Sequence, residues 1–334
     1  MRIAIVKLSA LGDIVHAMVV LQFIKLHNPK VIIDWIVEEE FAELLESNPD
    51  IHQIHKVNLK KAKKNKSFSV LINELLKVRK LGLYDIVVDL QGIIKSALIS
   101  KLINSKITLG FDKLSSREGL SSFFYNRVFS CRYDENIIIR NIQIINFALE
   151  IKINKKQIDQ KKPFLKPKNF KDKLCLETVS NNILLIPGAS FEAKMYPAEK
   201  YAELVKKINA NFLLIWGNDY EKKIANEIAS DAHNAQIINK LNLISLISLI
   251  SQVDLVIGSD TGPTHMAWAM NVPSITLYGA TPGHRNSYQT INNRIIESET
   301  EVNPYRINKS DFSIREIEVN DIVKMSKKLI KGLE

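Results

Sequence analysis

Near its start the chain carries the segment KLSALGDIVHA, in which polar residues interrupt an otherwise apolar run. Asp13 is the residue there that could do chemistry, because a carboxylate can act as a general base and take a proton from an attacking hydroxyl. Gly12 permits tight backbone geometry beside it. Asp13 would equally suit the N-cap of a following helix. From the residues alone, the base and the cap are about equally supported.

Three segments in the second half place small, hydroxyl and charged residues directly after apolar runs: IPGASFEAKMYP, LLIWGND and IGSDTGPTHMAWA. Backbone N–H groups and hydroxyls that meet at a helix start, with a lysine nearby, suit a diphosphate. The structural alternatives are a capped helix start in which the histidine only packs, and an exposed solubilising charge for the lysine. The candidate residues are Gly188, Ser190, Lys194, Asn218, Asp219, Asp260, Thr261, Gly262, Thr264 and His265.

We expect these segments to lie at the carboxyl edges of parallel sheets, where ligands of such sheets bind. Short β-branched runs alternate with stretches of helical spacing, which predicts βαβ units. The runs have little polar alternation, as strands buried on both faces should. The predicted strands are RIAIVKL, VIIDWIV, YDIVVDL, NNILLIP, NFLLIWG, VDLVIGS and PSITLYG.

The alternation predicts an α/β protein with two Rossmann-like domains. Residues 1–155 form the first and residues 182–313 the second, with a Lys- and Pro-rich linker or edge segment at 156–181. The repeat LISLISLIS suits a buried helix. Residues 314–334 have helical spacing and are expected to form a C-terminal helix that could pack back on the N-terminal domain.

Composition narrows the function classes. The chain has 334 residues, 46% hydrophobic and 25% charged, which is typical of a soluble globular protein. Its apolar runs fall short of the roughly 20 residues that cross a bilayer, and polar residues in the opening run argue against a secretory signal. Cys131 and Cys175 are too few for a disulfide framework and fit a reducing cytoplasm. The net charge of +10 predicts an anionic partner.

Further motifs extend this interpretation, and the ordered set is KLSALGDIVHA, DLQGIIKSAL, GFDKLSSREGLSSFFYNR, PGASFEAKMYP, WGND and SDTGPTHMAWA. In this order and spacing the chain resembles the lipopolysaccharide heptosyltransferases along nearly its whole length. The second and third motifs are most similar to the branch that adds the first heptose to Kdo-lipid A. The resemblance implies a GT-B architecture, two Rossmann-like domains facing across a cleft, with the acceptor on the N-terminal domain and ADP-heptose on the C-terminal one.

The resemblance also implies roles for individual residues. Asp13 is the general base that removes the proton from the Kdo hydroxyl, and Ser190 and Lys194 contact the diphosphate. Asp219 and Leu241 stand where the family often has a glutamate at the ribose and a methionine at the adenine. The remaining donor-site residues are Asp260, Thr261, Gly262 and His265, and those of the acceptor side are Lys7, Gly12, His16, Arg117 and Arg140.

The implied reaction is inverting transfer of L-glycero-D-manno-heptose from ADP-heptose to Kdo of Kdo-lipid A, in lipopolysaccharide inner-core biosynthesis. A carboxylate takes the acceptor proton, and positive charge stabilises the departing diphosphate. The sequence has no D-x-D motif to hold a metal at the donor phosphates, so we expect metal-free catalysis, no cofactor and a monomer. The alternatives are transfer of the second heptose within the same family and a two-domain nucleotide-sugar epimerase. A nucleic-acid partner is not expected, because the lysines are not interleaved with aromatic residues.

The stretch NLKKAKKNKSF, which follows the strand-like IHKVNL, gathers Lys60, Lys61, Lys63, Lys64 and Lys66. An isolated charge run is usually a solvated loop, but lysines near an anionic surface contribute about 1 kcal/mol each. Because the resemblance places an anionic lipid acceptor on this half, the hypothesis is that the lysines and Arg117 dock the enzyme on the inner face of the cytoplasmic membrane. The expected localisation is therefore cytoplasmic, peripheral to the inner membrane.

Overall fold

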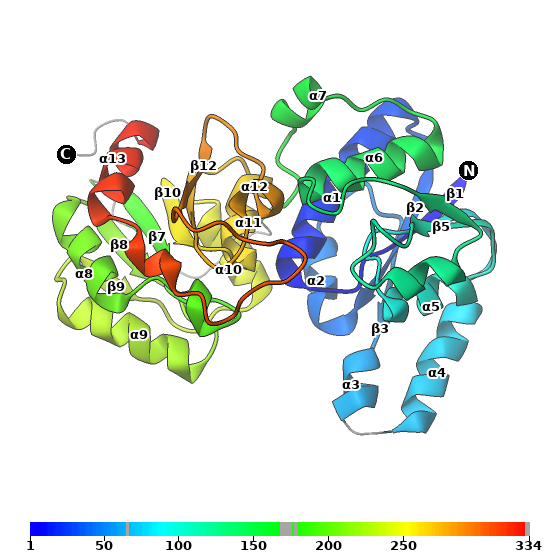
Figure 1. Ribbon diagram of the computed structural model, residues 1–334, viewed down its shortest axis with the longest axis horizontal. Coiled ribbons are helices and arrows are strands. Elements are labelled where there is room, and N and C mark those ends of the chain that lie inside the picture. Colours follow the sequence, from blue (N-terminus) through cyan, green and yellow to red (C-terminus); the bar gives the residue numbers. More distant parts are fainter. Residues whose placement is uncertain (65–66, 168–175, 177–179, 331–334) are drawn as a thin grey trace. The chain divides into compact units, whose positions relative to one another are not determined.

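A computed structural model divides the chain into two compact units, Met1–Phe164 and Leu165–Glu334 (Figure 1). The structure describes residues 1–64, 67–167, 176 and 180–330, so Cys175 lies outside the described residues. The first unit continues beyond residue 155, into the segment predicted as a linker. Phe164 is buried there, and its carbonyl oxygen accepts a hydrogen bond of 3.2 Å from the amide of Asn48.

A parallel sheet of six strands forms the centre of the first unit. Val6 of the central strand is in register with Ile36 on one side and with Asp89 on the other. Its apolar residues are buried on both faces, which is why this strand takes the centre. In spatial order the strands are β3 (Gln53–Val57), β2 (Ile32–Glu38), β1 (Arg2–Val6), β4 (Tyr84–Asp89), β5 (Ser105–Phe111) and β6 (Arg127–Phe129).

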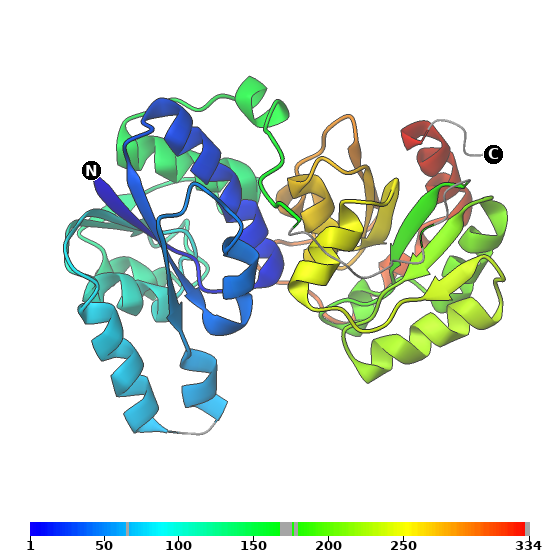
Figure 2. The same cartoon turned by 180° about the vertical axis from the view of Figure 1, so that it is seen from behind.

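Helices cover both faces of this sheet (Figures 1 and 2). Alternate residues of a strand point to opposite faces, and Ala4 and Val6 pack with residues of α4 and α5. Helix α1 packs against α6, and its residues 14–21 are all buried, as in a helix that is apolar all round. The helices are α1 (Leu11–His27), α2 (Ala42–Leu45), α3 (Leu59–Lys64), α4 (Phe68–Arg79), α5 (Ile94–Leu102), α6 (Ile137–Leu149) and α7 (Lys155–Asp159), with 3-10 turns η1 (Glu39–Phe41) and η2 (Gly119–Phe124).

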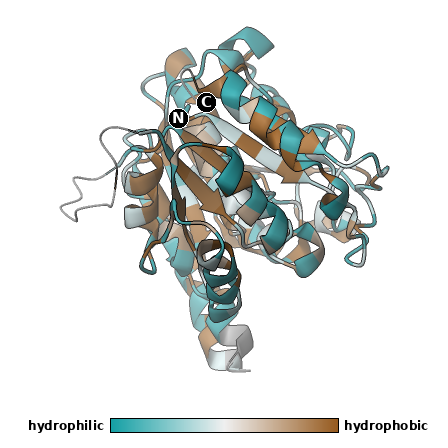
Figure 3. Ribbon diagram, turned by 90° about the vertical axis from the view of Figure 1, so that its left-hand side faces the viewer, coloured by the Kyte–Doolittle hydropathy of each residue, from teal (hydrophilic) through white to brown (hydrophobic). Residues whose placement is uncertain are grey.

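The second unit repeats this topology, with its own first strand at the centre of a parallel sheet of six strands. In spatial order the strands are β12 (Asn293–Glu297), β11 (Ser274–Tyr278), β10 (Leu255–Ser259), β7 (Asn182–Ile186), β8 (Asn211–Leu214) and β9 (Ala235–Ile237). Its helices are α8 (Ala198–Lys207), α9 (Asp219–Ser230), α10 (Leu243–Ile250), α11 (Gly262–Ala269), α12 (Gly283–Asn286) and α13 (Val319–Leu329), with 3-10 turns η3 (Glu192–Lys194) and η4 (Ser313–Glu316). The strands are mainly hydrophobic and the helices turn hydrophilic faces outward (Figure 3).

The C-terminal helix packs on the core of the second unit. Val319 and Ile322 of α13 are buried in the same apolar core as Tyr201 of α8. The hydroxyl of Tyr196 donates to the carbonyl oxygen of Ile317 at 2.8 Å, just before the helix. The apolar stripe that predicted a helix is therefore the stripe that binds it to the second sheet.

The structure confirms the seven predicted strands and the buried helix of the LISLISLIS repeat, which is α10. Strands β5, β6, β9 and β12 were not predicted. They are partly exposed, as in β6 and β9, and therefore lack the continuous apolar run that marks a central strand. None of the helices described here combines the length and apolar composition needed to cross a bilayer.

Each sheet reverses its strand order at one point. In the first sheet β2 and β4 flank β1, and in the second β8 and β10 flank β7. The loops that follow β1 and β4 therefore leave in opposite directions, as do those that follow β7 and β10. Open α/β sheets bind ligands in the crevice at such a switch point.

Candidate active site

The loop after β1 leads into helix α1 at the switch point of the first sheet and carries Asp13. Ala10 occupies the N-cap position and Asp13 is the third residue of the helix, so Asp13 is not the N-cap residue. Its Oδ2 lies 3.4 Å from the backbone nitrogen of Ala10, and its side chain is exposed. An exposed carboxylate in the first turn faces the positive end of the helix dipole and is open to a ligand.

Gln91, in the loop after β4, fixes the path of the chain toward Asp13. Its Oε1 accepts hydrogen bonds from the backbone nitrogens of Leu8 at 2.7 Å and Ser9 at 3.3 Å. Its Nε2 donates to Oγ of Ser9 at 3.2 Å. One amide thus joins the two loops of the switch point, a role that the sequence did not indicate for Gln91.

Asp89 ends β4 and is fully buried beneath the same loop. Its carboxylate accepts hydrogen bonds from the backbone nitrogen of Gln91 and from the hydroxyl of Tyr125, both at 2.8 Å. Burial raises the pKa of Asp89 above its ordinary value in spite of these hydrogen bonds. Asp89 therefore organises the loop from within the unit.

Two of the predicted acceptor residues near Asp13 are buried. Lys7 is 3% exposed, and its Nζ donates to the carbonyl oxygen of Leu90 at 3.0 Å. His16 lies one turn after Asp13 on α1 and is 4% exposed. Gly12 is the second residue of that helix. In this structure Lys7 and His16 belong to the packing around the loop and do not face solvent.

Arg117 and Arg140, predicted together on the acceptor side, have different surroundings. Arg117 is exposed. Arg140 is buried, and its guanidinium donates to the carbonyl oxygen of Ser115 at 2.5 Å and to that of Arg132. Its guanidinium carbon also lies 4.7 Å from the ring centre of Phe111. Arg140 therefore positions the segment that follows β5, a role that the sequence did not indicate.

The lysine segment is helical as far as Lys64, the last residue of α3, and Lys66 lies outside the described residues. Lys61 is exposed. Lys60 forms an ion pair with Glu40. At least one of the predicted docking cations is thus paired within the protein.

Asp260, directly after β10, gathers the polar side chains at the switch point of the second sheet. Its Oδ2 lies 2.8 Å from Nζ of Lys194, and its Oδ1 lies 3.0 Å from Nε2 of His265. The side chains of Thr281 and Asn286 donate to Oδ2 at 2.9 and 3.1 Å. The cluster therefore joins the loop after β7, the loop after β10 and the loop after β11.

The Asp260 cluster is buried and electrically balanced. Asp260 is 7% exposed and Lys194 is 9% exposed, so the interpretation of Lys194 as a solubilising surface charge is wrong. Burial by itself would raise the pKa of Asp260, but the Lys194 ammonium and the His265 hydrogen bond hold it well below its usual range. Asp260 is therefore ionised at neutral pH. The arrangement keeps the Lys194 ammonium at the carboxyl edge of the second sheet, where it could stabilise the charge of a departing diphosphate.

Helix α11 begins beside this cluster without a side-chain cap. Thr261 occupies the N-cap position and Gly262 the first helical position, yet the Thr261 side chain accepts no capping hydrogen bond. Thr264 donates its hydroxyl to the carbonyl oxygen of Ser259 at 2.9 Å. His265 does more than pack, because it binds Asp260. A helix start without a side-chain cap suits an anionic ligand.

The loop after β7 approaches α9 closely, and this requires glycine. A Cβ on Gly188 would lie 2.3 Å from Cδ of Glu221. Oε2 of Glu221 also accepts a hydrogen bond of 2.6 Å from the backbone nitrogen of Gly217. Ser190 is exposed two residues after the glycine. Glu221 thus lies between the loops that follow β7 and β8, in the region where the sequence analysis placed Asp219.

Asp219 is the exposed first residue of α9, and Leu241 is half-buried. Trp216, which was not among the predicted site residues, stands at the end of β8. Nζ of Lys222 lies 4.7 Å from its ring centre, and Nζ of Lys240 lies 5.8 Å from it. An aromatic ring near two lysines beside a strand end is a surface on which a nucleotide base could stack.

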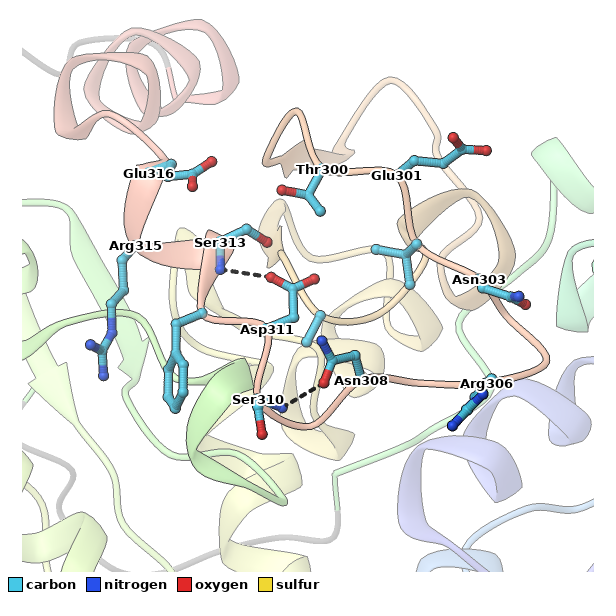
Figure 4. Close-up of a pocket in the computed structure, with 13 residues that line it drawn as sticks. Thr300, Glu301, Asn303, Arg306, Asn308, Ser310, Asp311, Ser313, Arg315 and Glu316 are labelled. Atoms are coloured by element: carbon cyan, nitrogen blue, oxygen red, sulfur yellow. Dashed lines mark hydrogen bonds between the residues drawn. The ribbon is translucent and has the colours of Figure 1, made fainter.

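An open pocket of about 680 Å³ lies in the second unit between Ala280 and Glu316 (Figure 4). Asp311 points into it and accepts a hydrogen bond of 3.0 Å from the backbone nitrogen of Ser313. Ala280, which lines the pocket, directly precedes Thr281 of the Asp260 cluster in the chain, but no member of that cluster lines the pocket itself. Within the described ranges, no three His, Cys, Asp or Glu side chains converge to hold a metal ion.

Solved structures share this architecture. The Escherichia coli heptosyltransferase WaaC with ADP gives a TM-score of 0.80 at 21% identity, over 99% of this chain and 100% of that one. The Escherichia coli ADP-heptose lipopolysaccharide heptosyltransferase II gives a TM-score of 0.73 at 20% identity, over 98% of each chain. Two doubly wound parallel domains with polar loops at their switch points form the GT-B architecture.

Sequence comparisons identify the family. The model described as glycosyltransferase family 9 (heptosyltransferase) matches residues 75–312. Lipopolysaccharide heptosyltransferase 1 of Campylobacter coli is 39% identical over 98% of this chain and 99% of its own length. The protein of that name from Pseudomonas aeruginosa is 28% identical over 86% of this chain and 81% of its own. The chain belongs to glycosyltransferase family 9, the heptosyltransferases, as its motifs indicated.

Proposed function

We propose that this protein is a heptosyltransferase I, which moves L-glycero-D-manno-heptose from ADP-heptose to Kdo of Kdo-lipid A in the lipopolysaccharide inner core. The observation that carries the proposal is the 39% identity to lipopolysaccharide heptosyltransferase 1 of Campylobacter coli along nearly the whole chain. The Asp260 cluster supports it, because it combines a carboxylate, an ammonium and an imidazole with the start of α11. These groups suit a nucleoside diphosphate and a sugar.

In the proposed reaction each unit contributes one half of the chemistry. Asp13 takes the proton of the Kdo hydroxyl as its oxygen attacks the anomeric carbon, and the bond from that carbon to the diphosphate oxygen breaks with inversion. Lys194 and the N–H groups at the start of α11 stabilise the negative charge on the departing ADP. Ser190, Asp219, Leu241 and Glu221 lie on the loops and helices that would surround the nucleotide. No cofactor takes part.

Product analysis tests the proposal directly. The protein is incubated with ADP-heptose and Kdo-lipid A, and the mass of the lipid product is measured by mass spectrometry. We expect one heptose to be added to Kdo-lipid A. Product formed only when the acceptor already ends in heptose would identify heptosyltransferase II instead. Release of an epimerised sugar without any acceptor would identify an epimerase. Activity that survives EDTA is expected for a metal-free reaction, and loss of activity would overturn that part.

The role of Asp13 has its own test, Asp13→Asn, which keeps a hydrogen-bonding oxygen but cannot accept a proton at neutral pH. If Asp13 is the base, turnover falls by about 100-fold or more. The melting temperature stays close to that of the parent, because the exposed carboxylate makes one long hydrogen bond, 3.4 Å to Ala10. Near-normal turnover of the variant would remove Asp13 from the catalytic role.

The lysine segment is proposed to hold the anionic acceptor, at the inner face of the cytoplasmic membrane and with the protein acting as a monomer. Replacing Lys60, Lys61, Lys63 and Lys64 by Ser should raise the acceptor KM and flatten its salt dependence. ADP-heptose binding should stay as before. The exposed Lys106, which pairs with Asp85, supplies a matched control in the same unit. An acceptor KM that does not change at low ionic strength would return the segment to a solvated loop.

A further inference from the structure

The first unit carries an exposed apolar surface that the proposed reaction does not use. It consists of large side chains on α5, on η2 and on the turn before η2, and three of them, Leu114, Leu120 and Phe123, are 83%, 59% and 77% exposed. Exposed apolar groups of this size are costly in water unless something covers them. We call this surface the α5–η2 face, and its members are Ile94, Leu98, Leu114, Leu120 and Phe123.

Local geometry places these side chains on neighbouring elements. Ile94 and Leu98 are four residues apart on α5, and Leu120 and Phe123 are three apart on a 3-10 turn, so each pair shares a face. Helix α5 contacts η2, and Oε2 of Glu118 accepts a hydrogen bond of 2.8 Å from the backbone nitrogen of Ile94.

The turn at Leu114 is held against the start of η2 by a tight backbone contact. A Cβ on Gly119 would lie 2.8 Å from the carbonyl oxygen of Lys113. The hydroxyl of Ser116 also donates to the carbonyl oxygen of Asp112 at 2.8 Å, which closes the turn. The exposed apolar tips therefore belong to one folded structure and not to separate loops.

The second unit has no comparable surface in its described part. Its exposed large apolar residues there are Tyr220 on α9, Ile291 before β12 and Tyr305 in the loop after β12. They lie on separate elements, so they form no continuous surface by sequence or by secondary structure. Isolated exposed apolar residues of this kind are normal. The contrast singles out the first unit.

The excess of positive charge also lies in the first unit. Met1–Phe164 contains 26 Lys and Arg against 17 Asp and Glu, whereas Leu165–Glu334 contains 20 against 19. Around the α5–η2 face Lys101, Lys113 and Arg117 are exposed. Of the nearby carboxylates, Glu118 binds the backbone nitrogen of Ile94. Apolar tips edged by cations complement an anionic bilayer, because the tips enter the interface and the cations meet lipid phosphates.

We propose that the α5–η2 face is the surface by which the first unit lies on an anionic lipid bilayer, with Leu114, Leu120 and Phe123 entering the headgroup region. The choice of a bilayer as the occupant rests on the proposed function, whose acceptor is a membrane lipid. This face is distinct from the lysine segment of α3, for which a purely cationic contact is proposed. Apolar side chains that enter the interface and cations that meet lipid phosphates together give stable but reversible attachment.

Vesicles that contain no lipopolysaccharide test the face independently of the reaction. The full chain is sedimented with vesicles of phosphatidylglycerol and phosphatidylcholine, and with vesicles of phosphatidylcholine alone. We expect binding to the anionic vesicles that is about tenfold weaker for Leu120→Ser/Phe123→Ser than for the parent. Ile291→Ser, which removes an equally exposed apolar side chain from the second unit, should bind as the parent does.

Further measurements separate the outcomes. Leu114→Ser, in an exposed turn, should also weaken vesicle binding, and its melting temperature and ADP affinity should match the parent. Equal sedimentation of the parent and the double variant would overturn the proposal. So would a dimer in solution that the double variant dissociates, because a second copy would then be the occupant. If vesicle binding behaves as expected while no heptose is transferred, the α5–η2 face is still the membrane-binding surface and the proposed function is wrong.

Discussion

Removing the Lys194 ammonium should leave a buried carboxylate without its main counter-charge. Lys194→Met keeps the length of the side chain but takes away the group 2.8 Å from Oδ2 of Asp260. Breaking a buried ion pair on one side costs about 3 to 5 kcal/mol. Four donors remain on Asp260, from His265, Tyr278, Thr281 and Asn286, so we expect the lower end, about 3 kcal/mol. The second unit should then melt about 6 to 12 °C lower.

The pH dependence of this variant has a distinctive sign. In the parent the pKa of Asp260 lies below its ordinary value, so the carboxylate stabilises the fold above about pH 4. That contribution is lost as the pH falls further. In Lys194→Met burial is no longer offset by the ammonium, and the pKa of Asp260 should rise. The variant should therefore approach the stability of the parent as the pH is lowered from 7 to 5.

Calorimetry measures both effects and separates them from ligand binding. The double variant Lys194→Met/Asp260→Asn should recover part of the lost stability, because it no longer buries an unpaired charge. ADP should bind both variants about 10- to 100-fold more weakly, since a charge-assisted hydrogen bond is worth about 1.5 to 3 kcal/mol. If the free energy of unfolding of Lys194→Met lies within about 0.5 kcal/mol of that of the parent at pH 7, the ion-pair reasoning is refuted. Unchanged ADP affinity would remove Lys194 from the donor site.

Three further predictions follow from buried contacts. Gly188→Ala should cost about 1 to 3 kcal/mol of stability, because its Cβ would meet Glu221. Adding Glu221→Ala should restore the melting temperature. A melting temperature of Gly188→Ala equal to that of the parent would contradict this. Asp34→Asn should cost about 2 to 4 kcal/mol, since the buried carboxylate binds Arg2. The pKa of Asp34 is held below its usual range, so the parent should lose stability below about pH 4, and a variant with the same acid transition would refute this. Arg140→Met should raise the acceptor KM but leave ADP affinity unchanged, and an unchanged KM would end its positioning role.

The sequence predicted those parts of the protein that depend on local patterns. Apolar runs located β1, β4, β7 and β10 because these strands are buried on both faces. Partly exposed strands were missed, since β9 is half-buried at each of its three residues and offers no such run. Sequence order also predicted that the loops after the central strands carry the candidate site residues, and the structure places those loops at the switch points of the two sheets. The pairing at the switch points was not predictable, because register between distant strands leaves no local pattern.

The candidate site follows the same division. Asp260 and Lys194 were identified from the loops that hold them, but their ion pair was not, since 66 residues of sequence separate them and only the fold brings them together. Asn286 and Thr281 were missed although they follow the predicted strand PSITLYG. Polar residues after that strand were the available signal. Gln91 stands within the motif DLQGIIKSAL, but a glutamine at that position does not by itself indicate that its side chain joins two loops.

The central position of each first strand has a consequence for folding during synthesis. Val6 pairs with Ile36 of β2, which is made soon afterwards, but also with Asp89 of β4 on the other side. At about 5 to 20 residues per second, the ribosome takes roughly 4 to 17 s to complete β4 after β1. During that time one edge of β1 has no partner strand, and an unpaired strand edge can pair with another chain. The second unit repeats the delay, because β7 must wait for β10. Each unit is therefore most exposed to aggregation in the interval before its fourth strand leaves the ribosome.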